Sequence, residues 1–511
     1  MLQLHEWQTE CLHIWARSGY RGIVNAVTGS GKTVLALSAV KHLEIVSGKE
    51  LRVKIVVPQT FLTGQWKEEL KRLLGAKPAD IGVYCGSRKD TSRKYMIYVV
   101  NSARYCLARH ILSDISGGAA VFLIADECHH YGSAENSRIF DFYKAIAEDA
   151  PYYALGLSAT PEIVNFKTIS TPLGREIYSY DLGRALRDKI ISRFILFTVT
   201  LGFSRDESDE YEELSLSLTK CLAYIRKKRP EIWDLPSALF FAQLQRLARQ
   251  EGRVAQAAST ALTLMYKRRT LSHMALARPL CAAAIVKALP AQARIILFCE
   301  RIQAAEKLFK VLSEQYPGQA GLYHSKMAGN ARKDMLERYK LGVNRLLICC
   351  KALDEGLNIP STDAGIIVSA SMSARQRVQR LGRMLRRSKD VKRIYYLYIE
   401  NSSEERELVL GLNTLENSVP LIALRYRDGA FYHAEYERLR GKALEYMSDH
   451  SHSPRLRDAL SQNIGRALIR GDFLLSEPAC RENLRLAGSV AERNYWTSVL
   501  YIILARLDKL N

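Results

Sequence analysis

Residues 26–33 read Ala-Val-Thr-Gly-Ser-Gly-Lys-Thr and follow an apolar run at 21–25. The run has the length and β-branched content of a buried strand, and the stretch at 34–46 after the turn has the pattern of a helix. A glycine-rich turn between a strand and a helix directs backbone N–H groups and the helix N-terminus at a bound phosphate. The stretch therefore predicts a phosphate-binding loop, and a glycine-rich turn without a ligand is the less favoured interpretation.

The sequence of the loop also predicts which of its residues bind the nucleotide and the metal ion. The residues expected to bind the nucleotide are Thr28, Gly29, Ser30, Gly31, Lys32 and Thr33. Lys32 is expected to reach the β- and γ-phosphate oxygens and to act in catalysis, and the Thr33 hydroxyl is expected to hold Mg²⁺. ATP and Mg²⁺ are therefore the predicted cofactors.

Short apolar runs alternate with helical stretches on either side of a different region. Such runs stand at 53–57, 96–100 and 121–125, and the pattern resumes at 294–299, 345–349, 365–368 and 394–398. Alternation of this kind is typical of parallel sheets covered by helices. We expect a first α/β lobe at 1–200, a basic helical insert at 201–280, a second α/β lobe at 281–400 and a helical C-terminal region at 401–511.

The amino-acid composition indicates the kind of partner and the cellular compartment to expect. The 511 residues carry 74 Lys and Arg against 53 Asp and Glu, a formal net charge of +21, which favours a polyanionic partner such as nucleic acid. The ten cysteines show no CxxC spacing that would indicate a zinc site or a disulfide framework. No signal peptide and no membrane-spanning apolar run are visible. We expect a cytoplasmic or nucleoid-associated protein without a membrane partner.

Two carboxylates directly follow the run at 121–125. A carboxylate at the carboxyl end of a buried parallel strand is where Mg²⁺ needs a partner, so Asp126 is the expected metal ligand beside Thr33. Glu127 is placed to deprotonate the attacking water. Acidic residues at a strand end often only cap the next helix, but the phosphate loop favours the catalytic interpretation. His129 and His130 are adjacent and cannot face one ion, and we expect His129 to hydrogen-bond to the motif at 158–161.

These motifs resemble, in order across residues 4–387, the motif series of superfamily 2 helicases. The matching segments are 4–8 (Q motif), 26–33 (motif I), 57–66 (Ia), 100–102 (Ib), 126–129 (II), 158–161 (III), 350–360 (V) and 379–386 (VI). The resemblance implies two RecA-like lobes, with Gln8 as the reader of adenine, although His5 replaces the arginine usual beside it. It also implies that Asp354 and Gly356 of motif V line the cleft near the ribose.

Motif VI adds a set of arginines. Arg380, Arg383 and Arg386 recur at three-residue spacing, which places them along one helix face. The resemblance implies that Arg383 and Arg386 act as arginine fingers on the γ-phosphate, with Gln379 also in the catalytic group, whereas Arg380 is the candidate to pair with motif II. Because the fingers belong to the second lobe, hydrolysis is expected to depend on lobe closure. A solvated arginine face is the alternative.

The insert and the C-terminal region carry less specific signals. Residues 221–280 hold eleven basic and three acidic side chains, a local net charge of +8. Among the aromatic residues there (Tyr224, Trp233, Phe240, Phe241 and Tyr266) we expect most to form a core, and we expect most of the charges to face DNA. The C-terminal region matches no catalytic motif. Its apolar residues predict a helical bundle that docks on the second lobe or on a partner protein such as a nuclease.

The functional prediction follows from the motif details. The segments QW at 65–66 and LGRMLRR at 381–387 look like those of XPB-type DNA helicases and of type I and type III restriction translocases. We therefore expect an ATP-dependent DNA helicase or DNA translocase, acting in repair, recombination or defence against foreign DNA. Two alternatives stay open: a nucleic-acid-gated ATPase that does not unwind and signals to an effector subunit, and an RNA helicase.

Overall fold

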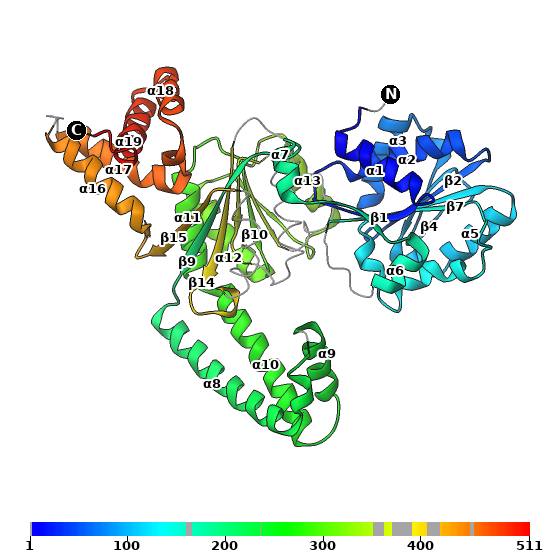
Figure 1. Cartoon of the computed structure of the whole chain (residues 1–511). Coiled ribbons are helices and arrows are strands. Elements are labelled where there is room, and N and C mark those ends of the chain that lie inside the picture. The colour runs from blue at the N-terminus through cyan, green and yellow to red at the C-terminus, as the bar shows by residue number, and fades with distance from the viewer. Residues whose placement is uncertain are drawn as a thin grey trace. The chain divides into compact units, whose positions relative to one another are not determined.

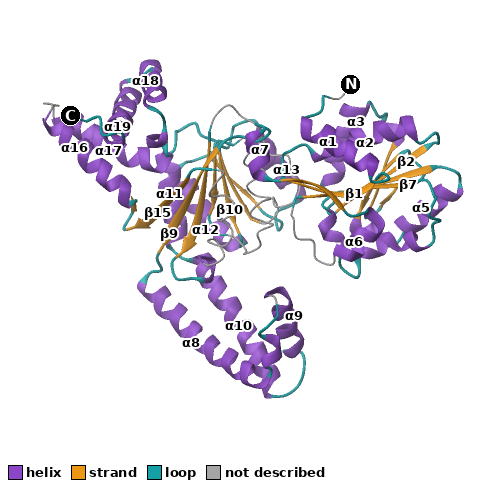
Figure 2. Ribbon diagram, viewed as in Figure 1, coloured by secondary structure: helices purple, strands orange, loops and turns teal. Residues whose placement is uncertain are grey.

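A parallel sheet forms the centre of each of two units. The structure, a computed structural model, describes residues 3–159, 166–235, 237–350, 362–369, 391–405, 419–449 and 454–510. Nearly all the described residues up to Phe194 form the first unit, and nearly all the described residues from Ile195 onward form the second. Each unit contains one eight-stranded sheet among the described residues, with helices beside it (Figures 1 and 2). The two α/β lobes expected from the sequence are confirmed.

The first lobe has the strand order β4-β3-β5-β2-β6-β7-β1-β8. Its strands are β1 (Arg21–Ala26), β2 (Leu51–Val57), β3 (Ile81–Cys85), β4 (Arg88–Lys89), β5 (Tyr95–Val99), β6 (Ala120–Ala125), β7 (Tyr152–Ser158) and β8 (Glu176–Tyr180). The β3–β4 hairpin is antiparallel, and the other pairs are parallel. All six residues of β6 are buried, as expected of a central parallel strand covered on both faces.

Helices of the first lobe connect these strands. They are α1 (Glu6–Arg17), α2 (Lys32–Val46), α3 (Leu62–Leu74), α4 (Val100–Ala103), α5 (Leu107–Ser116), α6 (Phe166–Leu173) and α7 (Leu182–Arg187), with 3-10 turns η1 (Pro78–Asp80), η2 (Cys128–Tyr131) and η3 (Asn136–Lys144). The phosphate loop joins β1 to α2, and η2 follows β6. The two nucleotide motifs therefore leave the carboxyl edge of the same sheet, where ligands of parallel sheets bind.

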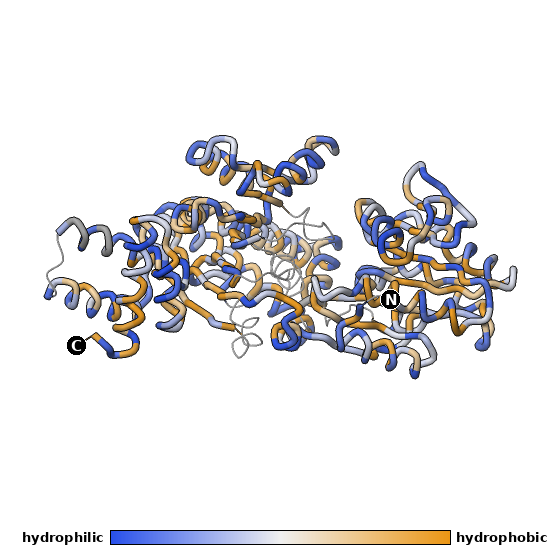
Figure 3. The backbone as a smooth tube through the Cα atoms, turned by 90° about the horizontal axis from the view of Figure 1, so that it is seen from above, coloured by the Kyte–Doolittle hydropathy of each residue, from blue (hydrophilic) through white to orange (hydrophobic). Residues whose placement is uncertain are grey.

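The second lobe has the strand order β11-β12-β10-β13-β14-β9-β15-β16. Its strands are β9 (Phe194–Leu201), β10 (Ile295–Cys299), β11 (Ala320–Tyr323), β12 (Leu346–Cys350), β13 (Ala364–Ile367), β14 (Lys392–Ile399), β15 (Leu421–Arg427) and β16 (Ala430–Tyr432). The helices α11 (Ala277–Ala288), α12 (Ile302–Gln315) and α13 (Gly329–Lys340) belong to the same unit. In Figure 3 the central strands of each lobe are coloured as hydrophobic.

Two of the expected boundaries are corrected by this sheet. The strand β9 pairs in parallel with β15 and belongs to the second sheet, so the first lobe ends where β9 begins and not at residue 200. The region after residue 400 is not helical throughout, because β15 and β16 extend the second sheet beyond the boundary expected at residue 400. The sequence does not show which sheet the strand β9 joins, because this depends on pairing with a segment more than two hundred residues away.

The insert is a helical arm that leaves the second lobe after β9 and returns at α11. It consists of α8 (Arg205–Lys228), the 3-10 turn η4 (Pro230–Ile232), α9 (Ser237–Leu247) and α10 (Arg253–Met274). The helices α8 and α10 lie side by side (Figure 1) around a small core of their own, which contains Leu218, Ile225, Leu244 and Ala258. The helical insert expected from the sequence is confirmed.

The C-terminal helices pack against the second lobe. They are α16 (Ala434–Asp449), α17 (Pro454–Arg470), α18 (Glu477–Leu486) and α19 (Val490–Arg506), with η5 (Asp472–Leu474). Leu468, Phe473 and Ile502 join the core of the lobe's sheet, while Arg393 of β14 pairs with Asp472 at 2.6 Å. The apolar residues of this region are therefore used largely within the chain. Among the described helices, none combines the length and the apolar character that crossing a membrane requires.

Candidate active site

The phosphate loop has the backbone of a phosphate-binding turn. Gly29 and Gly31 have φ values of 87° and 96°, in the left-handed region that glycine adopts without strain. Gly31 stands directly before α2 as its N-cap, so the first N–H groups of that helix have no partner within it. A Cβ at Gly31 would lie 2.7 Å from the side-chain nitrogen of Gln8. Both the backbone angle and the close approach therefore require glycine here.

Gln8 holds the loop from the N-terminal segment. Its Nε2 donates to the Gly31 carbonyl at 3.0 Å, and its Oε1 accepts from the His5 backbone N–H at 2.9 Å. The side chain is 1% exposed. Gln8, expected as the adenine reader, thus lies beside the loop and contacts it directly, while its adenine-reading role stays a prediction.

Buried hydroxyl groups in the loop fit a ligand rich in oxygen acceptors. Thr28 Oγ1 and Ser30 Oγ are buried and have no hydrogen-bond partner among the described residues. A buried hydroxyl without a partner costs about 1–3 kcal/mol, a cost that a phosphate oxygen would remove. Lys32 Nζ donates to the Ala26 carbonyl at 2.8 Å, and a phosphate would offer it a stronger, charge-assisted bond. The loop residues therefore fit a bound triphosphate.

Asp126 is a partly buried carboxylate held by a tryptophan from the helix α3. Trp66 of α3, which is 2% exposed, donates its Nε1–H to Asp126 Oδ2 at 2.9 Å. The Tyr131 hydroxyl donates to the Asp126 backbone carbonyl at 2.7 Å. The sequence marked Trp66 only as part of a motif resemblance, and Tyr131 was not singled out. No local pattern signals these contacts, because each joins segments that only the fold brings together.

The electrostatics of Asp126 favour a cation. Burial and the neighbouring charge of Glu127 raise the pKa of Asp126 to about 6, against the opposing effects of the Trp66 hydrogen bond and the Lys32 charge. A divalent ion stabilises the carboxylate form and offsets its burial. Asp126, with the Thr33 hydroxyl at the start of α2, therefore fits Mg²⁺ brought in with the nucleotide phosphates.

Glu127 sits in a strained backbone conformation at the start of η2. Its φ and ψ are both 48°, a left-handed region that costs a non-glycine residue on the order of 1 kcal/mol. Its Oε2 is buried and accepts no hydrogen bond from the described residues, while His129 Nδ1 lies 3.6 Å away. A carboxylate oxygen without a hydrogen-bond donor is free to accept a proton from water, which is what a general base requires.

His129 links the carboxylate motif to the next strand. Its Nδ1 lies 3.0 Å from Ser158 Oγ at the end of β7, and both side chains are buried. The hydrogen bond expected between His129 and the motif at 158–161 is confirmed. Thr160 and Pro161 of that motif lie outside the described residues.

The expected second-lobe residues also lie outside the described part of the chain. They are Asp354, Gly356, Gln379, Arg380, Arg383 and Arg386. Their assigned roles therefore stay predictions.

The charges of the insert are divided between its two ends. Residues 226–253, at the end away from the lobe, carry seven exposed basic and three acidic side chains; we call this segment the tip. At the other end, residues 205–213 of α8 carry six acidic and one basic side chain. Arg268 of α10 bonds to the Tyr211 hydroxyl at 2.8 Å, which places the basic residues at 267–269 beside that acidic half.

Two expectations for the insert are refined. Arg278, counted among its basic residues, is 1% exposed and ion-paired with Glu404, so it cannot face DNA. Trp233 and Phe240 pack together with their ring centroids 5.2 Å apart, as expected of core residues. Phe241 is 47% exposed and Tyr266 is 62% exposed, so the aromatic residues are divided between core and surface.

Comparison with known families agrees with the geometry. Residues 1–163 match the family described as type III restriction enzyme, res subunit. Residues 281–388 match the helicase conserved C-terminal domain. The first match contains the phosphate loop, Asp126 and Glu127, and the second spans motifs V and VI.

Curated relatives match most of the chain at low identity. The chain is 26% identical over 388 residues to the DNA 3'-5' translocase XPB2 of Sulfurisphaera tokodaii, with 76% of this chain and 79% of that protein covered. It is 23% identical over 373 residues to the putative DNA 3'-5' helicase Rad25 of Halobacterium salinarum, with 71% of this chain covered. The match covers 49% of that Rad25 protein, so the chain spans about half of its length.

Solved structures share the fold. The DUF1998 helicase MrfA bound to DNA and AMPPNP aligns with a TM-score of 0.54 at 13% identity, covering 83% of this chain and 52% of that one. S. cerevisiae Dbp5 bound to RNA and ADP BeF3 aligns with a TM-score of 0.52 at 9% identity, covering 82% and 89%. At these identities the likeness shows the fold alone, two RecA-like lobes.

Proposed function

Since this chain is a superfamily 2 helicase, close to XPB-like and restriction-type motors, we propose that it uses ATP hydrolysis to translocate along DNA and to separate its strands. The observation that carries the proposal is the pairing of a phosphate loop with Asp126 and Glu127 at one edge of one sheet. Loop hydroxyls without partners among the described residues and a partly buried carboxylate of raised pKa are the features that a magnesium nucleotide would satisfy.

Each of the proposed site residues would have a separate role in binding and hydrolysing ATP. Lys32 and the loop N–H groups would bind the β- and γ-phosphates, and Gln8 would keep the loop in place. Thr33 and Asp126 would hold Mg²⁺, which neutralises charge on the phosphate oxygens. Glu127 would accept the proton of the attacking water. Arg383 and Arg386 would stabilise the charge that develops on the γ-phosphate.

DNA is the proposed track because of the relatives, and the insert supports a nucleic-acid track in general. The relatives that match most of the chain are named as a DNA 3'-5' translocase and a putative DNA 3'-5' helicase. The tip of the insert offers seven exposed basic side chains in a segment of 28 residues, together with the exposed rings of Tyr224 and Phe241. Phosphate contacts from such a surface are independent of sequence, which suits a motor that steps along any duplex.

We place the activity in repair, recombination or defence against foreign DNA. The support is the kind of relative: the res subunit of a restriction enzyme on one side and Rad25-like helicases on the other. A nuclease or methylase gene beside the gene for this chain would select defence. A partner protein such as a nuclease would bind the outer surface of the C-terminal helices, since their apolar faces pack against the second lobe and against one another.

Phosphate release in the presence of matched DNA and RNA tests the proposal. We expect Mg²⁺-dependent hydrolysis that duplex or forked DNA stimulates more strongly than RNA of equal length. Equal or greater stimulation by RNA would overturn the assignment to DNA.

Displacement assays then separate movement from unwinding. Release of a third strand from a triplex reports translocation, and release of one strand from a fork reports unwinding. Activity in neither assay, with stimulated hydrolysis retained, would identify the ATPase that signals to an effector without unwinding.

A further inference from the structure

One face of the helix α10 is polar and lies on a helix without acidic residues. Between Arg253 and Met274 the helix contains no Asp or Glu, whereas residues 205–213 of the neighbouring helix α8 contain six. The neutral polar side chains of α10 recur at three- and four-residue spacing, which places them on one side of the helix. We call this set the α10 face, and its members are all exposed: Gln256, Ser259, Thr260, Thr263 and Tyr266. A surface of this composition does not repel a polyanion.

Tyr266 ends the α10 face beside the second sheet. Its hydroxyl accepts a hydrogen bond from the Arg301 guanidinium at 3.0 Å, and the guanidinium carbon lies 4.8 Å from the ring centroid. Arg301 is the second residue after β10, so the ring lies near the carboxyl end of that strand, where parallel sheets bind ligands. Tyr266 is nevertheless 62% exposed. A tyrosine ring held by an arginine is thus accessible where the helix meets the lobe.

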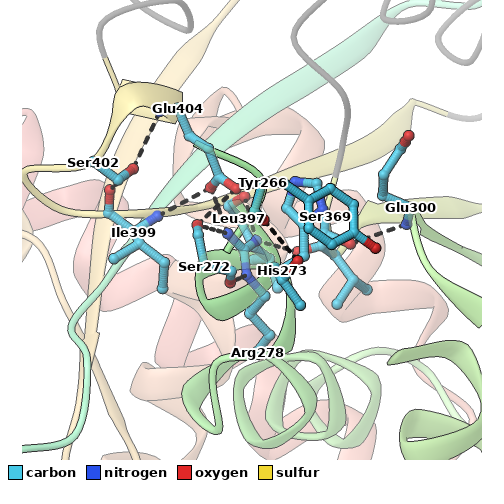
Figure 4. Close-up of polar contacts among 12 residues, drawn as sticks. Tyr266, Ser272, His273, Arg278, Glu300, Ser369, Leu397, Ile399, Ser402 and Glu404 are labelled. Carbon is cyan, nitrogen blue, oxygen red and sulfur yellow. Dashed lines mark hydrogen bonds and ion pairs between the residues drawn. The ribbon is translucent and has the colours of Figure 1, made fainter. Parts of the chain in front are cut away.

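A buried polar cluster fixes the end of α10 that carries Tyr266 (Figure 4). Ser272 and Arg278 are each at most 3% exposed. The Arg278 guanidinium donates to the Ser272 carbonyl at 2.7 Å and to the Leu397 carbonyl of β14 at 3.2 Å. The Ser272 hydroxyl donates to Glu404, which follows β14, at 2.8 Å. Because these contacts join the last turn of α10 to the second sheet, Tyr266 needs little further ordering when a ligand binds.

The arrangement has the chemistry of a site for an unpaired strand. Proteins that hold single strands combine a surface that follows the backbone with aromatic side chains on which bases stack. The basic tip, the α10 face and Tyr266 follow one another along a single helix. Gln256 and Tyr266 lie about 15 Å apart along the helix axis, a distance that at most about four nucleotides span at the duplex rise of 3.4 Å. A base inside a duplex cannot reach such a ring, because it is stacked between its neighbours.

We propose that the α10 face binds an unpaired strand of DNA and that Tyr266 stacks on one of its bases. The inference rests on the proposed function, in which the motor separates the strands and thereby produces an unpaired one. The tip would hold the duplex, and the α10 face would receive the strand released from it. Arg301 is a positioning residue in this site, because it contacts the Tyr266 ring and holds its hydroxyl.

Binding of single-stranded and duplex DNA to the full-length protein tests the role of Tyr266. The variant Tyr266→Leu keeps an apolar side chain but removes the aromatic face. We expect its Kd for a single strand to rise about tenfold, the size expected for one lost base stack, while its Kd for blunt duplex stays unchanged. The slope of log affinity against log salt should also stay the same, because stacking releases no counterions. Tyr266→Phe should retain most of the affinity, since the ring remains.

Fluorescence reports the stacking itself. A single strand that carries the adenine analogue 2-aminopurine at successive positions should be quenched at one or more of them by the unsubstituted protein and by Tyr266→Phe, but not by Tyr266→Leu. Tyr432→Leu is the matched control, because Tyr432 is 45% exposed and lies on β16, at the edge of the second sheet that is five strands from β10. This variant should bind and quench like the unsubstituted protein, and thermal unfolding monitors the folding of every variant.

A charge placed on the α10 face tests the path of the strand. Thr263→Glu should weaken single-strand binding about fivefold, as expected of one repulsion between exposed charges. The control is Thr219→Glu on α8, which should change the affinity little. Thr219 is exposed like Thr263, and each hydroxyl donates to the carbonyl four residues earlier, at 2.9 and 3.0 Å.

Three results would overturn the inference. They are unchanged single-strand affinity and quenching in Tyr266→Leu, an equal loss in Tyr266→Phe, and an equal loss of affinity for duplex DNA. Failure of DNA to stimulate hydrolysis by the unsubstituted protein would instead overturn the proposed function, and the binding measurements would still decide whether Tyr266 stacks on an unpaired base.

Discussion

Asp126 and Glu127 are neighbours in the sequence, yet the fold gives their carboxylates different surroundings. Asp126 is partly buried and receives a hydrogen bond from Trp66, and its pKa is raised to about 6. Glu127 is turned by its left-handed backbone and keeps one oxygen without a donor among the described residues. Asp126 is therefore suited to bind a cation, and Glu127 is suited to accept a proton.

Substitution of Glu127 by glutamine tests the proposed base. Glu127→Gln should still bind ATP but hydrolyse it at a rate lower by roughly 10²–10⁴, the contribution typical of general base catalysis. Lys32→Ala should lose turnover because the β- and γ-phosphates lose their cation. Phosphate release and binding of a fluorescent ATP analogue separate the two effects. Glu148→Gln, at an exposed position of the same lobe, is the control, and near-normal turnover by Glu127→Gln would show that another residue is the base.

The raised pKa of Asp126 predicts a pH-dependent stability. Because the folded-state pKa lies above the ordinary value of 3.8, the fold favours the protonated carboxyl. That contribution is fully present below pH about 4 and is lost as the pH rises through about 6. At pH 7 and without Mg²⁺ or nucleotide, Asp126→Asn should therefore unfold with a free energy higher by about 1–3 kcal/mol.

Thermal unfolding at a series of pH values measures this difference. The advantage of the Asp126→Asn variant should shrink as the pH falls from 7 towards 4, and magnesium nucleotide should stabilise the unsubstituted protein more than the variant. A difference that stays constant with pH would mean that Asp126 does not titrate in this range.

At the scale of elements, the insert shows how charge is organised along a helix pair. The acidic half of α8 lies beside the basic end of α10, where Arg268 contacts Tyr211. The tip has no such compensation, since its basic side chains outnumber its acidic ones by seven to three. The net charge of the insert, counted along the sequence, does not show that acidic and basic residues are separated between its two ends. The antiparallel packing of α8 against α10 reveals it.

The tip should account for part of the salt dependence of DNA binding. Reversal of Arg226, Lys227, Lys228 and Arg229 to glutamate should weaken binding and reduce the slope of log affinity against log salt by about 2–4, because each phosphate contact contributes about 0.9. Anisotropy across a salt series measures the slope. The matched control reverses Lys267 and Arg269, which are exposed at the base of the insert and should change the slope little. Equal slopes for the tip variant and the unsubstituted protein would show that the tip is only a solvated surface.

At the scale of the whole molecule, each unit has its own sheet and core, while the proposed catalytic residues are widely separated in the sequence. Lys32, Asp126 and Glu127 come from the first unit. Gln379, Arg383 and Arg386 come from the segment after β13. We propose that hydrolysis requires both sets of residues, which would make it depend on a hinge-type closure of the molecule.

The arginine finger gives the prediction that belongs to this scale. Arg386→Ala should lower kcat by roughly 10³ or more and change ATP affinity much less, because a finger acts on charge that develops in the transition state. Steady-state hydrolysis and analogue binding measure the two quantities. Arg387→Ala is the control, because this arginine follows Arg386 in the sequence and falls outside the three-residue spacing of Arg380, Arg383 and Arg386. A defect confined to KM would assign Arg386 to ground-state binding.

The sequence by itself determined the class of fold and nominated most of the residues proposed for the first-lobe site. Phosphate loops, buried parallel strands and acidic strand ends are local patterns, so residues 26–33 and 126–127 could be identified without any knowledge of contacts. The strands at 53–57, 121–125 and 294–299 were predicted for the same reason. The hydrogen bond between His129 and Ser158 could also be anticipated, because it joins two motifs whose order and spacing are characteristic.

Tertiary structure alone decided which sheet β9 joins, what holds Asp126 and where Arg278 lies. The pairing of β9 with β15, the bond from Trp66 to Asp126 and the pairing of Arg278 with Glu404 join residues 60 to more than 200 positions apart. The local pattern of apolar and polar residues indicates which face of a segment is buried. It contains no information about which distant segment covers that face. In the sequence, nothing distinguishes Arg278 from the other basic residues of the insert. Only the fold shows that it is buried among carbonyl and carboxylate oxygens of the second lobe.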